Sequence, residues 1–231
     1  MDTPASKKEK SSGSRQRWKQ DPEAVRSDIL RVATEEFATN GLSGARIDEI
    51  ASKTRTSKRM IYYYFDDKDG LYQQVLEEAY RKVRAQEREL DIDSLDSIEA
   101  LKRLVEFTFE HHSRNPDFIR LVMIENIHHG AYIEQSEVIS RLNRTAIDKL
   151  AAIYRKGRRE GVFRSGIKPL DIHWQISALS FFNVSNRATF TRIFGDELAT
   201  NAGQSRLRKL VVATVLRFVL TPESAAALGD R

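Results

Sequence analysis

The five prolines of the chain separate long segments in which no residue interrupts a helix. Proline lacks a backbone N–H and is tolerated in the first turn of a helix but not in its interior. Pro22 and Pro116 each follow an Asp or Asn, the order typical of an N-cap and a first-turn proline. Pro169 can open another helix, and Pro222 is expected to end the last one. This spacing favours helices over a fold of many strands.

Apolar residues recur at helical spacing between these prolines, and no alternating strand pattern stands out. The first stripe, which includes Val25, Ile29 and Phe37, stops at Asn40-Gly41. The sequence predicts an all-α fold of about nine helices. Those that the pattern bounds run over roughly residues 46–53, 57–64, 67–89, 137–160, 169–187 and 205–220, with further apolar stripes at 101–112 and 118–129.

Composition excludes several classes of protein. Of the 231 residues, 40% are hydrophobic and 31% charged, and none is cysteine. Disulfides, thiolate zinc sites and cysteine nucleophiles are therefore excluded. No apolar run is long enough for a membrane span, and the N-terminus lacks the apolar core of a secretory signal. We expect a cytoplasmic protein without a membrane partner.

The first twenty residues are basic and nearly free of apolar side chains. Six cations against two acids give residues 1–20 a charge of +4, most of the net +5 of the chain. We expect residues 1–20 to form a basic arm that is disordered in isolation. The arm is predicted either to enter a minor groove and attract phosphates, or to act only as a solubilising tail.

Residues 57–68, SKRMIYYYFDDK, combine three cations and three tyrosines within about three helical turns. They follow a short polar break at 54–56, which itself follows the amphipathic run IDEIA at 47–51. A helix, a tight turn and a second helix dense in Lys, Arg and Tyr are typical of a helix-turn-helix that presents side chains to a DNA major groove. The alternative is a solvated cationic helix face.

The runs IDEIA at 47–51, TSK at 56–58, IYYYF at 61–65 and KDGL at 68–71 resemble the DNA-binding domain of TetR-family regulators. The resemblance covers about residues 25–75. It implies a DNA-binding domain at 21–68 and a larger ligand-binding and dimerisation domain at 69–231. Three positions depart from the family pattern: Arg55 replaces a turn glycine, Ala45-Arg46 replaces a helix cap, and Gly70 stands where Glu would complete a capping box.

The predicted recognition helix supplies most candidates for DNA contact. Ser57 can cap it, which places Lys58 and Arg59 in its exposed first turn. Arg59 is the first choice for reading a base, followed by Lys58 and Tyr62. The resemblance implies phosphate or thymine-methyl contacts for Tyr62 and Tyr63 and a phosphate contact for Lys68. Arg46 is a further phosphate candidate, and the role of Tyr64 is open. The candidates are Arg46, Lys58, Arg59, Tyr62, Tyr63, Tyr64 and Lys68.

The stretch from Ile172 to Asn186 contains no Lys, Arg, Asp or Glu. A helix that is apolar all round is expected to be buried all round, which in a chain of this size indicates contact with a second subunit. The resemblance implies that this helix and the last one form a two-fold four-helix interface. Symmetry then predicts a homodimer on a palindromic operator.

Polar residues on otherwise apolar helix faces predict a ligand pocket. For each residue alone, a satisfied hydrogen bond in the core is the alternative. Glu125, if buried, needs a cation or several donors, and Arg120 is the simplest partner. The ligand-binding candidates are His112, Glu125, His128, His129, Trp174, Gln175, Phe182, Asn183 and Asn186.

The sequence predicts a homodimeric, ligand-responsive transcriptional regulator, most plainly a repressor released from its operator by a small aromatic or polar organic effector. One alternative is a DNA-binding protein without an effector. Another is a helical metal-dependent enzyme, because Glu125 and His128 have the spacing of half a di-iron site. A second such pair is missing from the sequence, and no phosphate-binding loop or nucleophile elbow is present. We therefore expect no enzyme activity, no metal and no cofactor.

Overall fold

The computed structural model describes residues 21–54 and 56–229, so the predicted basic arm and the departure at Arg55 lie outside the described residues. The fold is 82% helical without strands in this part of the chain, which confirms the all-α prediction. The described residues form twelve α-helices and one short 3-10 helix, rather than about nine helices. No described helix is long and apolar enough to cross a membrane.

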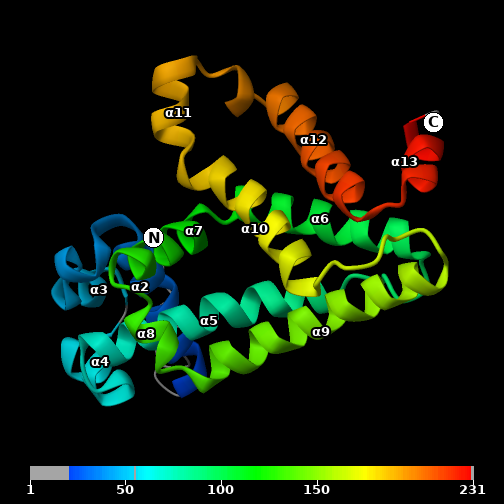
Figure 1. Ribbon diagram of the computed structural model, residues 1–231. Coiled ribbons are helices and arrows are strands. Elements are labelled where there is room, and N and C mark those ends of the chain that lie inside the picture. Colours follow the sequence, from blue (N-terminus) through cyan, green and yellow to red (C-terminus); the bar gives the residue numbers. More distant parts are fainter. Residues whose placement is uncertain (1–20, 55, 230–231) are drawn as a thin grey trace, which may run out of the picture. The chain divides into compact units, whose positions relative to one another are not determined.

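The chain divides into two compact units between Val75 and Leu76, within the fifth labelled helix. The elements are shown in Figure 1. Those of the first unit are α2 (Pro22–Gly44), α3 (Ile47–Lys53), α4 (Lys58–Phe65) and the start of α5 (Lys68–Arg88). The second unit continues α5 and adds α6 (Ser97–Arg114), α7 (Pro116–Ile127), α8 (Ala131–Glu134), α9 (Glu137–Arg159), α10 (Pro169–Ser185), α11 (Arg187–Phe194), η1 (Glu197–Ala199), α12 (Asn201–Val219) and α13 (Pro222–Gly229).

Local signals place most helix boundaries where the sequence predicts them. Asp21 accepts hydrogen bonds from the amides of Glu23 and Ala24, both at 3.1 Å, and so caps α2. Regular helix in α2 stops at Gly41, whose φ of 71° is open to glycine but costly for other residues. The helices α8, α11 and α13 were not predicted, and they account for the excess over nine helices.

The expectation for Pro222 was wrong in one respect: it opens α13 instead of only ending the preceding helix. The hydroxyl of Thr221 accepts from the amide of Ser224 at 3.3 Å and caps this added helix. The preceding helix, α12, stops at Val219, because the next residue, Leu220, forms an isolated antiparallel bridge with Phe163.

The core of the first unit is built on α2. Ile29, Phe37, Ile50 and Ile61 are fully buried there. Phe37 meets the buried ring of Tyr72 edge to face, with centroids 5.0 Å apart. In this unit α3 packs on α2 and α4 packs on α3, and the burial of Ile61 fixes which face of α4 remains exposed.

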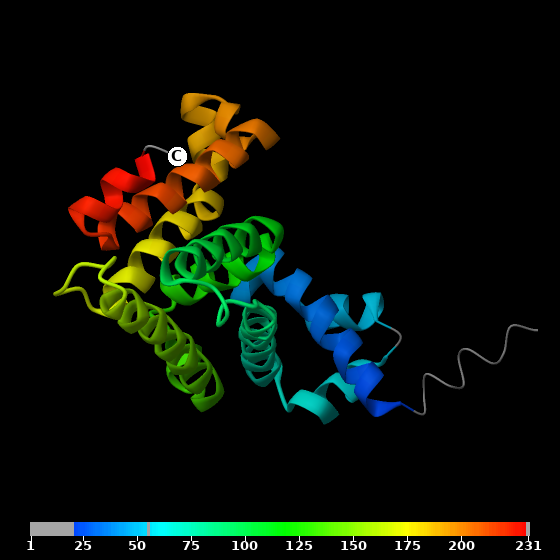
Figure 2. The ribbon, with the colours of Figure 1, turned by 90° about the vertical axis from the view of Figure 1, so that its right-hand side faces the viewer.

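In the second unit, α10 and α12 pack on α6 and on each other (Figures 1 and 2). Their shared core includes Leu101, Phe163, Ile172 and Val215. Phe163 closes this core against Gly157 of α9, where a Cβ would lie only 2.1 Å from the Phe163 ring. The uncharged stretch is not buried all round within one chain: Trp174 is 67% exposed and Phe182 53% exposed. Only Ile172, Ile176 and Ser180 of α10 are buried.

Candidate DNA-binding surface and ligand cavity

The short helix α4 has one buried face and one exposed face. Its N-cap Ser57 accepts from the amide of Met60 at 3.3 Å, as predicted. Ile61 and Phe65 turn into the core. The other face exposes four of the predicted DNA-binding residues, Lys58, Arg59, Tyr62 and Tyr63, and Tyr63 is 76% exposed. Tyr64 is half-buried, with its ring 5.4 Å from that of Tyr63.

Arg59 is the unpaired cation of this face. Its guanidinium has no ion pair or hydrogen bond to any described residue. Lys58 differs, because its Nζ lies 3.0 Å from Asp48 of α3, and the hydrogen bond to that carboxylate raises the pKa of Lys58. Arg59 is therefore the cation of α4 that can pair with a base or phosphate without first breaking an ion pair to a described residue.

The two candidates outside α4 lie at helix starts. Arg46 is exposed at the N-cap of α3 and makes no side-chain cap there. The Nζ of Lys68 donates to the carbonyl of Ser43 at 3.3 Å. Asp67 accepts from the amide of Gly70 at 2.7 Å, so the first turn of α5 is capped. A Cβ at Gly70 would lie 2.3 Å from the carbonyl oxygen of Phe65, which explains why the Glu of a capping box is absent.

A buried acid that no sequence pattern indicated holds α3 on α2. Glu36 is only 3% exposed. Its carboxylate accepts from Asn40 at 2.8 Å, from Lys53 at 2.9 Å and from the amide of Arg46 at 3.4 Å. Burial alone would raise the pKa of Glu36, but these donors outweigh it and leave the pKa below its ordinary value. One carboxylate thus binds both ends of α3, because Arg46 precedes that helix and Lys53 ends it.

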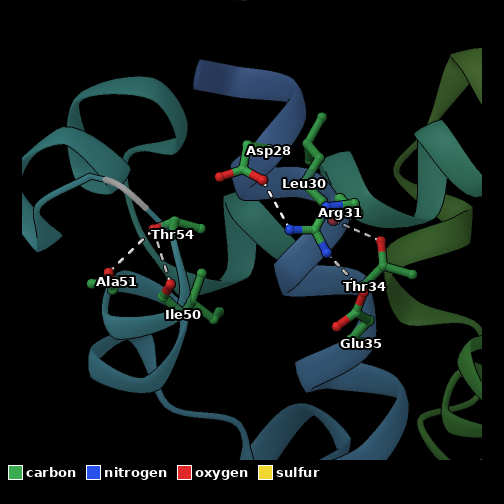
Figure 3. Close-up of polar contacts among 8 residues, drawn as sticks. All are labelled: Asp28, Leu30, Arg31, Thr34, Glu35, Ile50, Ala51 and Thr54. Carbon is green, nitrogen blue, oxygen red and sulfur yellow. Dashed lines mark hydrogen bonds and ion pairs between the residues drawn. The ribbon is translucent and has the colours of Figure 1, made fainter. Parts of the chain in front are cut away.

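Figure 3 shows two sets of polar contacts in this unit, one at the C-terminus of α3 and one along α2. The hydroxyl of Thr54 donates to the carbonyls of Ile50, at 3.0 Å, and Ala51, at 3.3 Å, and so closes the C-terminus of α3. Arg31 on α2 pairs with Asp28 and Glu35, both at 2.9 Å. Its charge is therefore compensated within its own helix, unlike that of Arg59.

The larger cavity has a volume of about 540 Å³ and lies wholly within the second unit. Five helices form its walls, namely α5, α6, α7, α9 and α10. Aromatic rings supply much of its surface. Its aromatic and polar lining residues are Tyr80, Arg84, Glu87, Phe107, Thr108, His111, His112, Phe118, Asn126, Asn143, His173, Trp174, Ser177 and Phe181.

The polar groups of this cavity centre on Arg84. Its guanidinium pairs with Glu87 and donates to the Oδ1 of Asn143 at 2.9 Å. Desolvation, and then repulsion by neighbouring cationic groups, lowers the pKa of His111 to about 4 and that of His112 to about 3. Both imidazoles are therefore neutral near pH 7. Desolvation lowers the pKa of His173 as well.

A second cavity of about 420 Å³ lies among α10, α11, η1 and α12. Its walls are mostly apolar. Its main polar elements are Asn183 and Gln204, whose amides bond to each other reciprocally at 2.8 and 2.9 Å. This pair of hydrogen bonds joins α10 to α12. The chain between these two helices forms α11 and η1 (Figure 1).

The predicted ligand residues separate into three groups. His112 and Trp174 line the larger cavity, and Phe182, Asn183 and Asn186 line the second one. Glu125, His128, His129 and Gln175 line neither.

Glu125 is buried, but Arg120 is not its partner. Its Oε2 accepts from the amides of Tyr132, at 3.2 Å, and Ile133, at 3.1 Å, at the start of α8. Arg120 instead lies 3.9 Å from Asp117. In the described part of the chain, no three His, Asp or Glu side chains are grouped closely enough to hold a metal ion.

Sequence reasoning missed the most polar part of the larger cavity. Arg84 lies in a helix rich in charge, where an arginine is ordinarily solvated, and His173 was not singled out. Only the assembly of α5, α6 and α10 brings Arg84, His111 and His173 to one space. A sequence signal pointed only to their neighbour His112, which is a polar residue on an apolar stripe.

A helix-turn-helix followed by a helical unit with an internal cavity defines the class of DNA-binding transcriptional regulators. The profile of bacterial regulatory proteins of the tetR family matches residues 29–75, and that of the tetracyclin repressor-like C-terminal domain matches residues 98–215. The chain belongs to the TetR family. Its family and relatives are regulators rather than enzymes.

Known relatives agree with this assignment. The chain is 33% identical to the HTH-type transcriptional repressor NicS of Pseudomonas putida, over 78% of this chain and 85% of that protein. It is 32% identical to the HTH-type transcriptional repressor SCO4008 of Streptomyces coelicolor, over 69% of this chain and 78% of that protein. The crystal structure of SCO4942 from Streptomyces coelicolor matches with a TM-score of 0.64 and 25% identity, over 84% of this chain and 98% of that one.

Proposed function

We propose that the protein is a homodimeric repressor that binds a palindromic operator and is released by a small organic effector. The observation that carries the proposal is the continuity of α5. This helix begins at Lys68, beside the helix-turn-helix, and its later turns place Tyr80 and Arg84 in the wall of the larger cavity. A change at the cavity is thus applied to a helix whose first turn belongs to the DNA-binding unit. Binding to chromosomal DNA would place its action in the cytoplasm.

Repression is supported by the relatives, since both NicS and SCO4008 are described as transcriptional repressors. In this proposal Arg59 reads a base, with Lys58 and Tyr62 beside it. Tyr63, Lys68 and Arg46 hold phosphates, which position the protein without reading sequence. Tyr64 is half-buried and supports the neighbouring Tyr63 ring.

Dimerisation is supported by the apolar surface of α10 and α12. Leu170, Trp174 and Phe182 on α10 and Leu210 on α12 are all more than half exposed. Water-exposed apolar area of this extent on adjacent helices is typical of a surface that another protein covers. A two-fold partner would cover it with the same surface and would set the spacing between two recognition helices.

The proposed switch is a population shift between two dimer conformations. An effector that binds the conformation with misplaced recognition helices lowers operator affinity by its preference for that conformation. A coupling of about 1–3 kcal/mol corresponds to a change of roughly 5- to 150-fold. The cavity of about 540 Å³ favours this proposal over an effector-independent DNA-binding protein, since it lies in the size range of small-molecule sites.

The proposal is tested by selecting duplexes from a random library with the purified protein and measuring operator binding by fluorescence anisotropy. We expect inverted repeats, and a particle of twice the 26.5 kDa chain mass in light scattering. Leu210→Glu should give monomers with weak operator binding. The matched control Ile127→Glu, at an exposed apolar residue of α7, should remain dimeric. Selection of non-repeated sites by a monomer would contradict the proposal.

A further inference from the structure

One region of the larger cavity is a continuous set of rings. Tyr80 and Phe118 meet edge to face with centroids 5.3 Å apart. His111 lies 5.7 Å from Phe118 and 5.8 Å from Phe107. Rings in this arrangement present flat faces and edges, which favour a planar aromatic guest over a flexible chain. Their combined surface lies within a cavity of about 540 Å³.

The same cavity wall carries a cation with an unused donor. Arg84 is largely buried, and two of its nitrogens bond to Glu87 and Asn143. Its Nε is buried and has no partner among the described residues. A buried N–H without an acceptor costs free energy, so an acceptor brought by a ligand would gain more there than at the surface.

Two imidazoles add further unused donors. His111 is 6% exposed and His112 is 9% exposed, and both line the cavity. Each neutral ring has one N–H, but neither ring makes a hydrogen bond to another described residue, and both Nδ1 atoms are buried. Arg84 and both imidazoles therefore offer three N–H groups that no acceptor of the described protein uses.

The charges around these donors leave room for one anion. The titratable and charged lining groups are Tyr80, Arg84 and Glu87 on α5, His111 and His112 on α6, and His173 on α10. The lining residues of α7 and α9 are uncharged. Glu87 is thus the single acid of the wall, and it already pairs with Arg84. A ligand that brings one carboxylate would share the Arg84 charge and use the imidazole donors.

We propose that this cavity binds a small aromatic monocarboxylate, with its carboxylate at the Arg84, His111 and His112 donors and its ring among Tyr80, Phe107 and Phe118. This inference rests on the proposed effector-responsive function and specifies the chemical class of the effector. Two carboxylate oxygens supply acceptors for all three unused N–H groups, which a neutral hydrocarbon cannot do.

Calorimetric titration of the full chain with a fixed panel tests the proposal. The panel consists of benzoate, phenylacetate, 1-naphthoate and indole-3-acetate, each paired with its primary amide. We expect at least one acid to bind tenfold or more tightly than its amide, which has the same ring without the charge. Absence of binding by every acid, or equal binding by the amides, would overturn the assignment of an aromatic acid.

Two variants of Glu87 locate the carboxylate. Glu87→Gln keeps the cation and removes the competing acid, so the best acid of the panel should bind several-fold more tightly and its amide equally well. The double variant Glu87→Gln/Arg84→Gln carries no buried unpaired charge and should lose the preference for the acid. Retained preference in the double variant would also refute the site. Melting curves of each variant show that it is folded.

Operator binding is measured separately, so that the two proposals fail in different ways. If the protein binds its operator and is released only by neutral compounds, the ligand class is wrong and the repressor function stands. If an acid binds at Arg84 but no operator is selected, the proposed repressor function is wrong and the ligand site stands. If an acid binds and releases the operator in the wild type but not in the double variant, both stand.

Discussion

Acidification should destabilise the unliganded protein through the buried pair His111 and His112. Their pKa values in the folded state are about 4 and about 3, against 6.5 for an exposed imidazole. Between pH 6.5 and about 4 the unfolded chain therefore binds protons that the folded protein does not. The unfolding free energy rises with pH wherever the unfolded state binds more protons. It must therefore fall as the pH drops below 6.5.

The size of the effect follows from these values. A pH of 5 lies 1.5 units below the pKa of an unfolded imidazole. Each unit corresponds to about 1.4 kcal/mol of unfolding free energy. His112 should therefore cost about 2 kcal/mol. His111, whose pKa of about 4 also lies below pH 5, should cost nearly the same. A total loss of up to about 4 kcal/mol is a large part of the roughly 5–15 kcal/mol that stabilises most proteins.

Urea unfolding followed by circular dichroism at pH 7, 6 and 5 measures this loss. The double variant His111→Gln/His112→Gln removes both titrations, so its unfolding free energy should fall much less over this range. His129→Gln, at an exposed histidine, is the matched control and should keep the slope of the wild type. Glu36 does not confuse the result, because hydrogen bonds from its donors lower its pKa, so its contribution is lost mainly below this pH range. Equal slopes in the wild type and the double variant would refute the reasoning.

Other substitutions test the DNA-binding surface. Arg59→Ala should cost about 1–3 kcal/mol of discrimination at one base pair, and Lys68→Ala should weaken all duplexes alike and reduce the salt slope by about one, as measured by anisotropy across salt concentrations. Unchanged binding by both variants would contradict the assigned surface. Asp48→Asn frees Lys58 from an exposed ion pair, so operator affinity should rise modestly at low salt. A fall in affinity would show that the pair instead orders α4. Glu36→Gln should reduce the unfolding free energy by about 1.5–3 kcal/mol, because the charged acceptor for Lys53 is lost. Urea unfolding measures this loss, and an unchanged midpoint would show that Glu36 does not stabilise the position of α3.

The helices near strong local signals were predictable. Asp21 and Pro22 mark the start of α2, Gly41 its break, and Ser57 the start of α4. These signals act through backbone groups within a few residues, so they do not depend on the rest of the fold. The two-sided character of α4 was predictable for the same reason, since helical period alone turns Ile61 and Phe65 to one side and Arg59 away from it.

Periodicity, caps and motif spacing are local properties, so the all-α fold and the cationic face of α4 could be predicted from them. Three features could not be predicted in this way: Arg84 and His111 meet in one cavity, Glu36 accepts from both ends of α3, and Glu125 caps α8. These groupings join residues from different helices, and their chemistry depends on burial that no single helix provides. The exposure of the Trp174 and Phe182 rings of α10 also could not be predicted, because an uncharged helix does not specify which of its faces the rest of the chain covers.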